Sequence, residues 1–460
     1  MSSEELDQLL AAQQAYVESG ATRPYAFRVE QLRKLKRMLQ ANEDRLLAAL
    51  AADMHKPGLE AFLAEVGFLY ADINHTLKHL KRWMKPRRVG TPLQLIPSRG
   101  VIYKEPLGRV LIIAPWNYPL MLLLAPLTAA LAAGNVAVLK PSELAPATSA
   151  LIAELIGKTF PREYVAVIEG GVAESQQLLA RRWDHIFFTG GGAVGKVVAR
   201  AAAEHLTPVT LELGGKSPCI VTADADLDLA ARRIVWGKFY NAGQTCVAPD
   251  YLLVHASIKQ PLLERMAGYI RSFYGDDPKA SPDLARIISD RHFDRLAAML
   301  AAGGARVVCG GQLDRTQRYI APTVLADVGL DHPTMYEEIF GPILPVLTYD
   351  RLDEAIATVR RMSHPLALYL FTRDAATERR VLESLPFGGG CINDVVIHLS
   401  NPDLPFGGVG GSGTGAYHGE YGFNTFSHHK SVVHSGTWLD VKLRYLPSGD
   451  KLKLFRRIFR

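Results

Sequence analysis

The chain has 460 residues, with a hydrophobic fraction of 48% and a charged fraction of 21%, which excludes a disordered or collagen-like protein. The formal net charge is +6. The last ten residues alone contain five basic ones, Lys451, Lys453, Arg456, Arg457 and Arg460, and the rest of the chain is close to neutral. The charge therefore does not indicate a nucleic-acid-binding protein, and we expect no nucleic-acid partner.

The cysteines and the beginning of the chain bear on compartment and metal content. The chain has only four cysteines, too few for a disulfide framework, and none has the C-x-x-C spacing of a zinc site. We therefore expect no metal. The opening "MSSEELDQLL" is acidic and lacks the basic region and cleavage site of a secretory signal. A cytoplasmic location is the expectation.

The first half of the chain begins with helical patterns and continues into an apolar core. Residues 1–85 are helical in pattern, with breaks at Gly20 and Pro57-Gly58, and residues 86–106 suggest a short extended excursion. The segment 110–140 is nearly all apolar, but prolines interrupt it, which argues against a transmembrane helix. We interpret it as a buried strand at 110–114, a helix from about 120 to 133 and a strand at 136–139.

Strand and helix patterns alternate along the rest of the chain. Strands are predicted at 164–170, 185–190, 208–215, 251–256, 305–311 and 367–372. Helices are predicted between and after them, at 174–180, 193–206, 227–243, 259–273, 291–304, 353–362 and 376–385. This order is typical of an α/β protein with parallel strands and right-handed crossovers.

The stretch "FFTGGGAVGKVV" at 187–198 matches two nucleotide-binding patterns. The phosphate-loop pattern requires Ser or Thr after the lysine, where this chain has Val197. The dinucleotide pattern G-x-G-x-x-G is satisfied by Gly190, Gly192 and Gly195, between a predicted strand and a predicted helix. By spacing alone, Glu212 would then contact a ribose, although a glycine turn without a ligand is the alternative.

A possible nucleophile follows in "NAGQTCVAP". A lone cysteine such as Cys246 is commonly a small buried hydrophobe. A thiol becomes useful for catalysis when a base and an oxyanion donor accompany it. Glu212 in "TLELGGK" and Asn117 in "PWNYP" are candidates for these two roles.

Seven motifs occur in the order found in the aldehyde dehydrogenases: "PWNYP", "LKPSE", "FFTGGGAVGK", "TLELGGKSP", "GQTC", "EEIFGP" and "PFGG". The resemblance spans about 25–434 and is strongest to the class 3 branch, which includes fatty and aromatic aldehyde dehydrogenases. It implies an α/β fold with a Rossmann-like parallel-sheet cofactor domain, an α/β catalytic domain and a small β oligomerisation element. The implied segments are 1–85 and 101–211 (cofactor), 212–395 (catalytic), 86–100 and 423–440 (oligomerisation), and 441–460 (a basic amphipathic tail).

The resemblance also implies roles for individual residues. Cys246 would be the nucleophile, Asn117 the oxyanion donor and Glu212 the base that activates water to hydrolyse the thioester. Ribose recognition then moves from Glu212 to the "KPSE" segment. The implied cofactor contacts are Trp116, Lys140, Glu143, Gly190, Gly195, Glu338 and Phe340. Gly192 departs from the family, which often has Thr there, so the pyrophosphate contacts are open, as is the choice between NAD and NADP.

The function implied is oxidation of a medium- or long-chain aliphatic or an aromatic aldehyde to the acid, through a Cys246 thioester. A CoA-acylating enzyme and a catalytically silent scaffold are the alternatives; acylating relatives generally lack the glutamate found at position 212. A homodimer is expected. Leu454, Phe455, Ile458 and Phe459 fall on one helical face among basic residues, which indicates a weak membrane-surface contact or a dimer-wrapping or frayed tail. Five further residues are candidates for the substrate funnel: Tyr118, Trp236, Tyr240, His398 and His418.

Overall fold

The computed structural model describes residues 2–92, 95–440 and 442–458. Its first part is a layer of helices, in agreement with the pattern of residues 1–85. They are α1 (Ser3–Glu18), α2 (Tyr25–Ala41), α3 (Glu43–Met54), the short α4 (Gly58–Ala61), a π-helical turn η1 (Phe62–Val66) and α5 (Gly67–Trp83). Both expected breaks are present, since Gly20 has a φ of 73° and Pro57 immediately precedes α4.

The first large sheet has six strands in the order β17-β7-β6-β3-β4-β5. All its pairs are parallel except the short β17, which is antiparallel to β7. The strands are β3 (Arg109–Ile113), β4 (Val136–Lys140), β5 (Val165–Val167), β6 (His185–Thr189), β7 (Val209–Glu212) and β17 (Gly413–Thr414). Its helices are α6 (Met121–Ala133), α7 (Pro146–Thr159), α8 (Val172–Leu179) and α9 (Gly192–Ala203).

The apolar segment 110–140 forms the strand, helix and strand that its sequence predicts, as β3, α6 and β4. Helix α6 buries 12 of its 13 residues, which explains why it is apolar on every side. It packs on α2, α5 and α15 (Gly419–Thr425). Among the residues that the structure describes, no helix is long and apolar enough to cross a membrane.

The second sheet has seven strands in the order β10-β13-β14-β9-β8-β15-β16. They are β8 (Pro218–Val221), β9 (Tyr251–His255), β10 (Arg306–Cys309), β13 (Thr323–Ala326), β14 (Ile343–Tyr349), β15 (Ala367–Phe371) and β16 (Gly389–Ile392). The associated helices are α10 (Leu227–Phe239), α11 (Lys259–Tyr274), α12 (Asp290–Ala301), α13 (Leu352–Arg360) and α14 (Ala375–Ser384). The sequence analysis did not predict β8, β13, β14, β16 or α7. Two of these strands, β8 and β13, are continuous buried runs, and β14 is buried except at Thr348, so none shows the alternation that marks a half-exposed strand.

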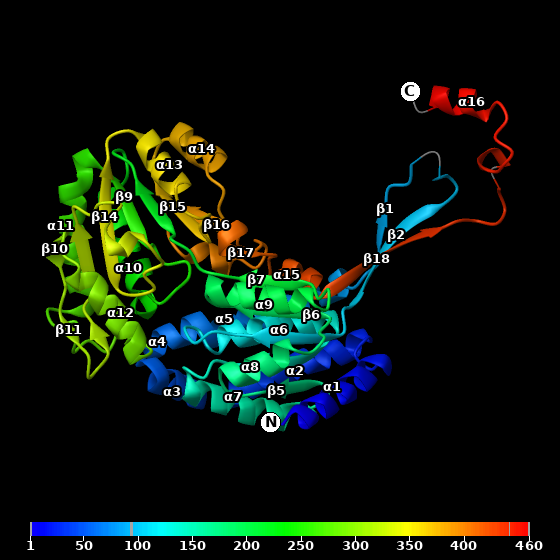
Figure 1. The fold of residues 1–460 in the computed structure, drawn as a ribbon, viewed down its shortest axis with the longest axis horizontal. Helices are drawn as coiled ribbons and strands as arrows, with labels where there is room; N and C mark the ends of the chain where they lie inside the picture. Colours follow the sequence, from blue (N-terminus) through cyan, green and yellow to red (C-terminus); the bar gives the residue numbers. More distant parts are fainter. Residues whose placement is uncertain (1, 93–94, 441, 459–460) are drawn as a thin grey trace.

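A three-stranded antiparallel sheet projects from the body of the molecule (Figure 1). It contains β1 (Arg87–Val89), β2 (Arg99–Pro106) and β18 (Ser427–His434), so β2 continues past residue 100. The helix α16 (Lys451–Ile458) follows at the far end of this arm. The remaining short elements are β11 (Leu313–Asp314), β12 (Tyr319–Ile320) and 3-10 turns at Tyr240–Gly243, Ala256–Ile258, Pro333–Met335, Ile397–Ser400, Gly410–Ser412 and Lys442–Arg444.

Candidate active site

The site lies where the edges of the two large sheets meet. Asn117 follows the carboxyl end of β3, Gly190 follows β6, and Glu212 is the last residue of β7. Open parallel sheets bind ligands at this carboxyl edge. Cys246 and Phe340, by contrast, come before the amino ends of β9 and β14 in the second sheet. A cavity of about 480 Å³ lies between the two edges and is lined by all five of these residues.

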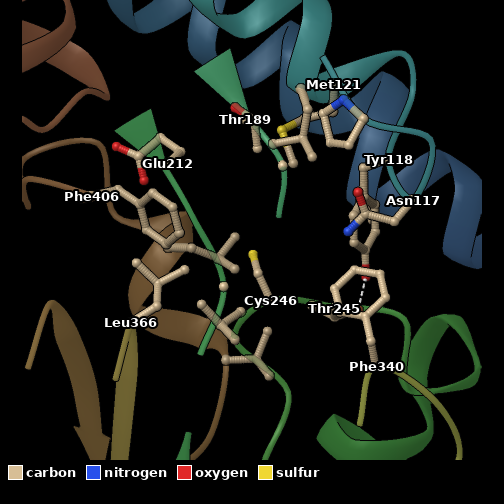
Figure 2. Close-up of a pocket in the computed structure, with 18 of the residues that line it drawn as sticks. Asn117, Tyr118, Met121, Thr189, Glu212, Thr245, Cys246, Phe340, Leu366 and Phe406 are labelled. Atoms are coloured by element: carbon tan, nitrogen blue, oxygen red, sulfur yellow. Dashed lines mark hydrogen bonds between the residues drawn. The ribbon is translucent and has the colours of Figure 1, made fainter. Parts of the chain in front are cut away.

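Cys246 lies in the middle of this cavity, with Glu212 on one side and Asn117 on the other (Figure 2). The chain reaches this position through a turn after α10, in which Asn241, Ala242 and Gly243 all have positive φ values of 53°, 50° and 74°. A side chain at Gly243 would approach the Gly341 carbonyl oxygen to 2.2 Å, so only glycine fits. Left-handed backbone at non-glycine residues is unfavourable and is commonly found at functional sites.

Asn117 is tied directly to the loop that carries Cys246. Its side-chain Nδ2 donates to the Gln244 carbonyl at 3.1 Å, and its own backbone carbonyl accepts from Asn241 Nδ2 at 3.0 Å. Gln244 in turn donates from Nε2 to the Arg286 carbonyl at 3.0 Å, and its Oε1 accepts from the Ile288 N–H at 3.0 Å. The amide group of Asn117 is thereby fixed relative to the thiol, which is the requirement for an oxyanion donor.

Burial shifts the pKa values of Cys246 and Glu212. The pKa of the Cys246 thiol is raised to about 12, mainly by burial and in smaller part by the nearby Glu338 and Glu212 carboxyl groups. Burial also raises the pKa of Glu212 well above its ordinary value. Neither carboxyl oxygen of Glu212 has a hydrogen-bond partner among the described residues. The Cys246 thiol is therefore neutral near pH 7, and burial favours the protonated form of the Glu212 carboxyl group.

The glycine loop leaves the N-terminus of α9 open. A side chain at Gly190 would approach the Phe188 ring to 2.6 Å, and one at Gly195 would approach Leu213 to 2.7 Å. At Gly191 and Gly192 a β-carbon would meet nothing within 4 Å. Among the residues that the structure describes, no side chain caps this helix, so its first N–H groups are available to an anion. The unusual Gly192 thus lies at an open helix end rather than in a packed position.

A second cavity, of about 640 Å³, lies beside α9 and has Glu338 in common with the first. It is lined by Gly192, Lys216, Glu338 and Arg361, among others. Burial raises the pKa of Glu338 to about 8, and Asp250 contributes to that increase. Phe340 and Trp116 lie edge to face with ring centroids 5.3 Å apart, and both line the first cavity. An open helix N-terminus beside this cavity suits the phosphates of a dinucleotide.

Lys140 and Glu143 lie outside both cavities. Lys140 ends β4, is buried, and donates from Nζ to the Pro141 carbonyl at 2.7 Å. Its Nζ is 3.8 Å from Glu143 Oε2, and the Glu143 side chain is half-exposed. Burial lowers the pKa of Lys140, and Glu143 raises it in part. Both residues remain at the carboxyl edge of the sheet, one strand away from Asn117 and Trp116.

The rest of the wall of the first cavity is largely apolar. Tyr118, Trp236, Tyr240 and His418 line it, in agreement with the sequence analysis. His398 does not; it stacks on Phe406 with ring centroids 6.1 Å apart. The wall also includes Leu63, Phe68, Met121, Leu122, Val396, Ile397, Leu399 and Phe406.

The sequence analysis missed two charged residues behind Asn117, namely Lys56 and Glu65. Their side chains are fully buried and form an ion pair, with Nζ and Oε1 2.5 Å apart. The available signal was the position of Glu65, a single charge between Phe62 and Tyr70 in an otherwise apolar run. Charged residues are almost never fully buried unless they are paired.

Known proteins resemble this chain over nearly its whole length. The model of the aldehyde dehydrogenase family matches residues 1–432. The chain is 47% identical to the 4,4'-diaponeurosporen-aldehyde dehydrogenase of Staphylococcus aureus, covering 99% of both chains. It is 48% identical to human aldehyde dehydrogenase family 3 member B1, over 94% of this chain and 92% of that protein.

Solved structures give the same result. The substrate-bound state of Staphylococcus aureus AldH superposes with a TM-score of 0.97 at 47% identity, over 99% of both chains. The NAD-dependent aldehyde dehydrogenase of Sinorhizobium meliloti gives 0.85 at 31% identity, over 95% of this chain and 89% of that one. The chain therefore belongs to the aldehyde dehydrogenase family. It is an oxidoreductase that uses NAD or NADP to oxidise aldehydes to carboxylic acids.

Proposed function

We propose that Cys246, Asn117 and Glu212 carry out this oxidation through a thioester. The observation that supports the proposal best is their convergence: three elements far apart in sequence bring a thiol, an amide and a carboxyl group to one cavity. The Cys246 thiol releases its proton to water, its thiolate sulfur attacks the aldehyde carbon, and the carbonyl oxygen becomes an alkoxide. The Asn117 amide and the Cys246 backbone N–H stabilise that charge.

The second half of the reaction requires a base. When the oxyanion collapses, the carbon loses hydride, and the acyl group remains on Cys246 as a thioester. A bound NAD or NADP would supply the nicotinamide ring that accepts this hydride. Glu212 takes a proton from a water molecule, and the resulting hydroxide cleaves the thioester to release the acid. Because its pKa is raised, ionised Glu212 is a stronger base than a solvated carboxylate.

The chain's own residues supply a site for the cofactor. The open N-terminus of α9, with Gly190 and Gly195 shaping the turn, suits the pyrophosphate. Lys140 and Glu143 are proposed to bind the adenosine ribose, and Glu338 the nicotinamide ribose. Phe340 and Trp116 would then lie near the nicotinamide ring. The cofactor domain would comprise 1–85 and 101–211, and the catalytic domain 212–395.

The apolar wall of the first cavity supports medium- or long-chain aliphatic and aromatic aldehydes as substrates. The test is a panel of aldehydes of graded length with NAD and with NADP, following absorbance of the reduced cofactor. The aldehyde named for the Staphylococcus aureus relative belongs in the panel. Release of free acid without coenzyme A supports the proposal. A strict requirement for coenzyme A would indicate an acylating enzyme, and no turnover with any aldehyde a silent scaffold.

We also propose a homodimer formed through segments 86–100 and 423–440, and a cytoplasmic location. The projecting sheet supports the first, and four free cysteines support the second. Helix α16 has a basic, apolar composition, with Leu452 and Leu454 exposed, which supports weak contact with an anionic membrane surface. The sequence predicts that Phe459 belongs to the apolar face of this helix, but Phe459 lies outside the described residues.

The tail proposal is tested by sedimentation with vesicles of neutral and of anionic lipid, using the full chain and a variant that ends at residue 450. Binding to anionic vesicles that is lost in the shortened variant supports a membrane contact. A shift of the shortened variant from dimer to monomer, without vesicle binding by either form, supports a dimer-wrapping tail.

A further inference from the structure

A buried ion pair lies directly behind the loop that carries Asn117. Lys56 Nζ is 2.5 Å from Glu65 Oε1 and donates to the Asn117 backbone carbonyl at 2.9 Å. The same ammonium lies 4.2 Å from the centre of the Tyr118 ring. Lys56 therefore contacts two consecutive residues of the loop between β3 and α6.

A π-helical turn places Glu65 in this position. In η1 the Gly67 N–H donates to the Phe62 carbonyl, five residues earlier, instead of four as in an α-helix. A side chain at Gly67 would approach that carbonyl oxygen to 3.0 Å, so glycine suits this turn. Such turns are frequent at functional sites. Here the turn lies in the cavity wall, since Leu63 and Ala64 line the cavity.

Glu65 reaches the other end of the same loop. Its Oε2 accepts from the backbone N–H groups of Leu120 at 2.9 Å and Met121 at 3.2 Å, where α6 begins. A carboxylate at a helix N-terminus is favoured by the helix dipole and satisfies donors that have no intrahelical partner. The ion pair thus fixes both ends of the segment 117–121.

The side chain of Asn117 leaves one donor for the substrate. Its Nδ2 carries two N–H groups, and one is used by the Gln244 carbonyl at 3.1 Å. Its backbone carbonyl receives two donors, Lys56 Nζ and Asn241 Nδ2. The direction of the remaining side-chain N–H therefore depends on a backbone that Lys56 and Glu65 hold.

We infer that Lys56 and Glu65 are positioning residues for the Asn117 oxyanion donor. This inference rests on the proposed role of Asn117. Two fully buried charges are costly to desolvate, and apolar residues of similar volume are often as stable, so stability by itself does not explain the pair. A displacement of about 1 Å at a reacting group can cost about 10²-fold in rate, which makes rigid support valuable.

The test compares Glu65→Gln with Asp53→Asn. Asp53 is the matched control, because it is also a buried carboxylate at a helix N-terminus, accepting from the Ala147 and Thr148 N–H groups at 2.9 Å each. Glu65→Gln is expected to lower kcat about 10- to 100-fold, below the about 10²–10³-fold loss of a removed oxyanion donor, with little change in KM. Asp53→Asn is expected to lower the Tm without lowering kcat. Equal kcat losses in the two variants would overturn the inference.

A double-mutant cycle with Asn117→Ala separates positioning from general damage. If Glu65 acts through Asn117, then Glu65→Gln costs no further kcat once Asn117 is removed. Fully additive losses would overturn the inference, while an Asn117→Ala variant with unchanged kcat would overturn the proposed oxyanion role itself. If Glu65→Gln does not fold, the double substitution Lys56→Met with Glu65→Met replaces the pair by apolar groups and enters the same cycle.

Alkylation of Cys246 by iodoacetamide is an independent readout, because that reaction forms no oxyanion. Its rate is expected to stay within about twofold of wild type in the Glu65→Gln and Lys56→Met/Glu65→Met variants. A parallel loss of alkylation and turnover would show that the pair supports the whole site rather than Asn117.

Discussion

The backbone carbonyl of Glu212 accepts a hydrogen bond from the Gly190 N–H at 3.0 Å. Gly190 follows β6 and Glu212 ends β7, so the first glycine of the loop and the proposed base lie on adjacent strands. The Glu212 side chain nevertheless lies in the wall of the cavity that holds Cys246 (Figure 2). The spacing rule for dinucleotide sites points to Glu212, which does end the strand next to the glycine loop. Its position in the cavity wall supports the role of a base instead of a ribose ligand.

Replacement of the nucleophile should abolish dehydrogenase activity without loss of fold. We expect Cys246→Ala to show no reduced cofactor above background with any aldehyde, while its Tm stays close to that of wild type. Cys309→Ala is the control, because Cys309 is a partly buried cysteine in β10, outside both cavities. If Cys246→Ala keeps its rate, the thioester mechanism is wrong.

Glu212→Gln should trap the acyl-enzyme. Without the base, the first turnover proceeds and the thioester then accumulates, since a glutamine cannot accept the proton from water. The measurement is a burst of reduced cofactor of about one equivalent per site, together with a mass increase equal to the acyl group. Unaltered steady-state turnover would remove Glu212 as the base.

The same substitution should also change how stability depends on pH. Folded Glu212 keeps its proton above about pH 4.3, the ordinary pKa at which the unfolded chain loses it, because burial raises the folded pKa. The unfolded state then binds fewer protons, so the contribution of Glu212 to stability falls as the pH rises. We expect the Tm of Glu212→Gln, relative to wild type, to increase as the pH rises above about 4.3; a constant difference would contradict the raised pKa.

Turnover should rise with pH. Burial raises the pKa of both Cys246 and Glu212, so the ionised forms that react become more abundant as protons are removed. We expect kcat/KM to increase from about pH 6 to about pH 9, with the thermal stability recorded at each pH as a control. A profile that falls over this range would contradict the assignment of these groups as nucleophile and base.

The two kinds of glycine in the loop should respond differently to alanine. Gly190→Ala places a methyl group against the buried Phe188 ring and is expected to lower the Tm. Gly192→Ala enters open space at the first residue of α9, where alanine is the better helix former, and should leave the Tm unchanged or slightly raised. A KM for the cofactor that increases in Gly192→Ala, with the fold intact, would indicate that the cofactor comes close to this position. A Tm lowered equally by both substitutions would contradict the packing described here.

The sequence by itself was enough to predict most helices and strands and to select the thiol, amide and carboxyl side chains proposed for catalysis. The apolar run at 110–140 predicted β3, α6 and β4 because a buried crossover must be apolar on every side. The motifs around Asn117, Glu212 and Cys246 indicated the family, which the comparisons confirm. Local patterns suffice here, because helices, parallel strands and turns impose periodicities within a few residues.

Only the tertiary structure decided which groups meet. Cys246 is 129 residues from Asn117 in the sequence, and hydrogen bonds across the sheet edges bring their loops together. No sequence motif identifies Lys56 and Glu65. Their surroundings are a π-helical turn and the start of α6, which lies more than 50 residues further along the chain. Contacts between elements distant in sequence depend on how the two sheets pack, and hydrophobic periodicity carries no information about that packing.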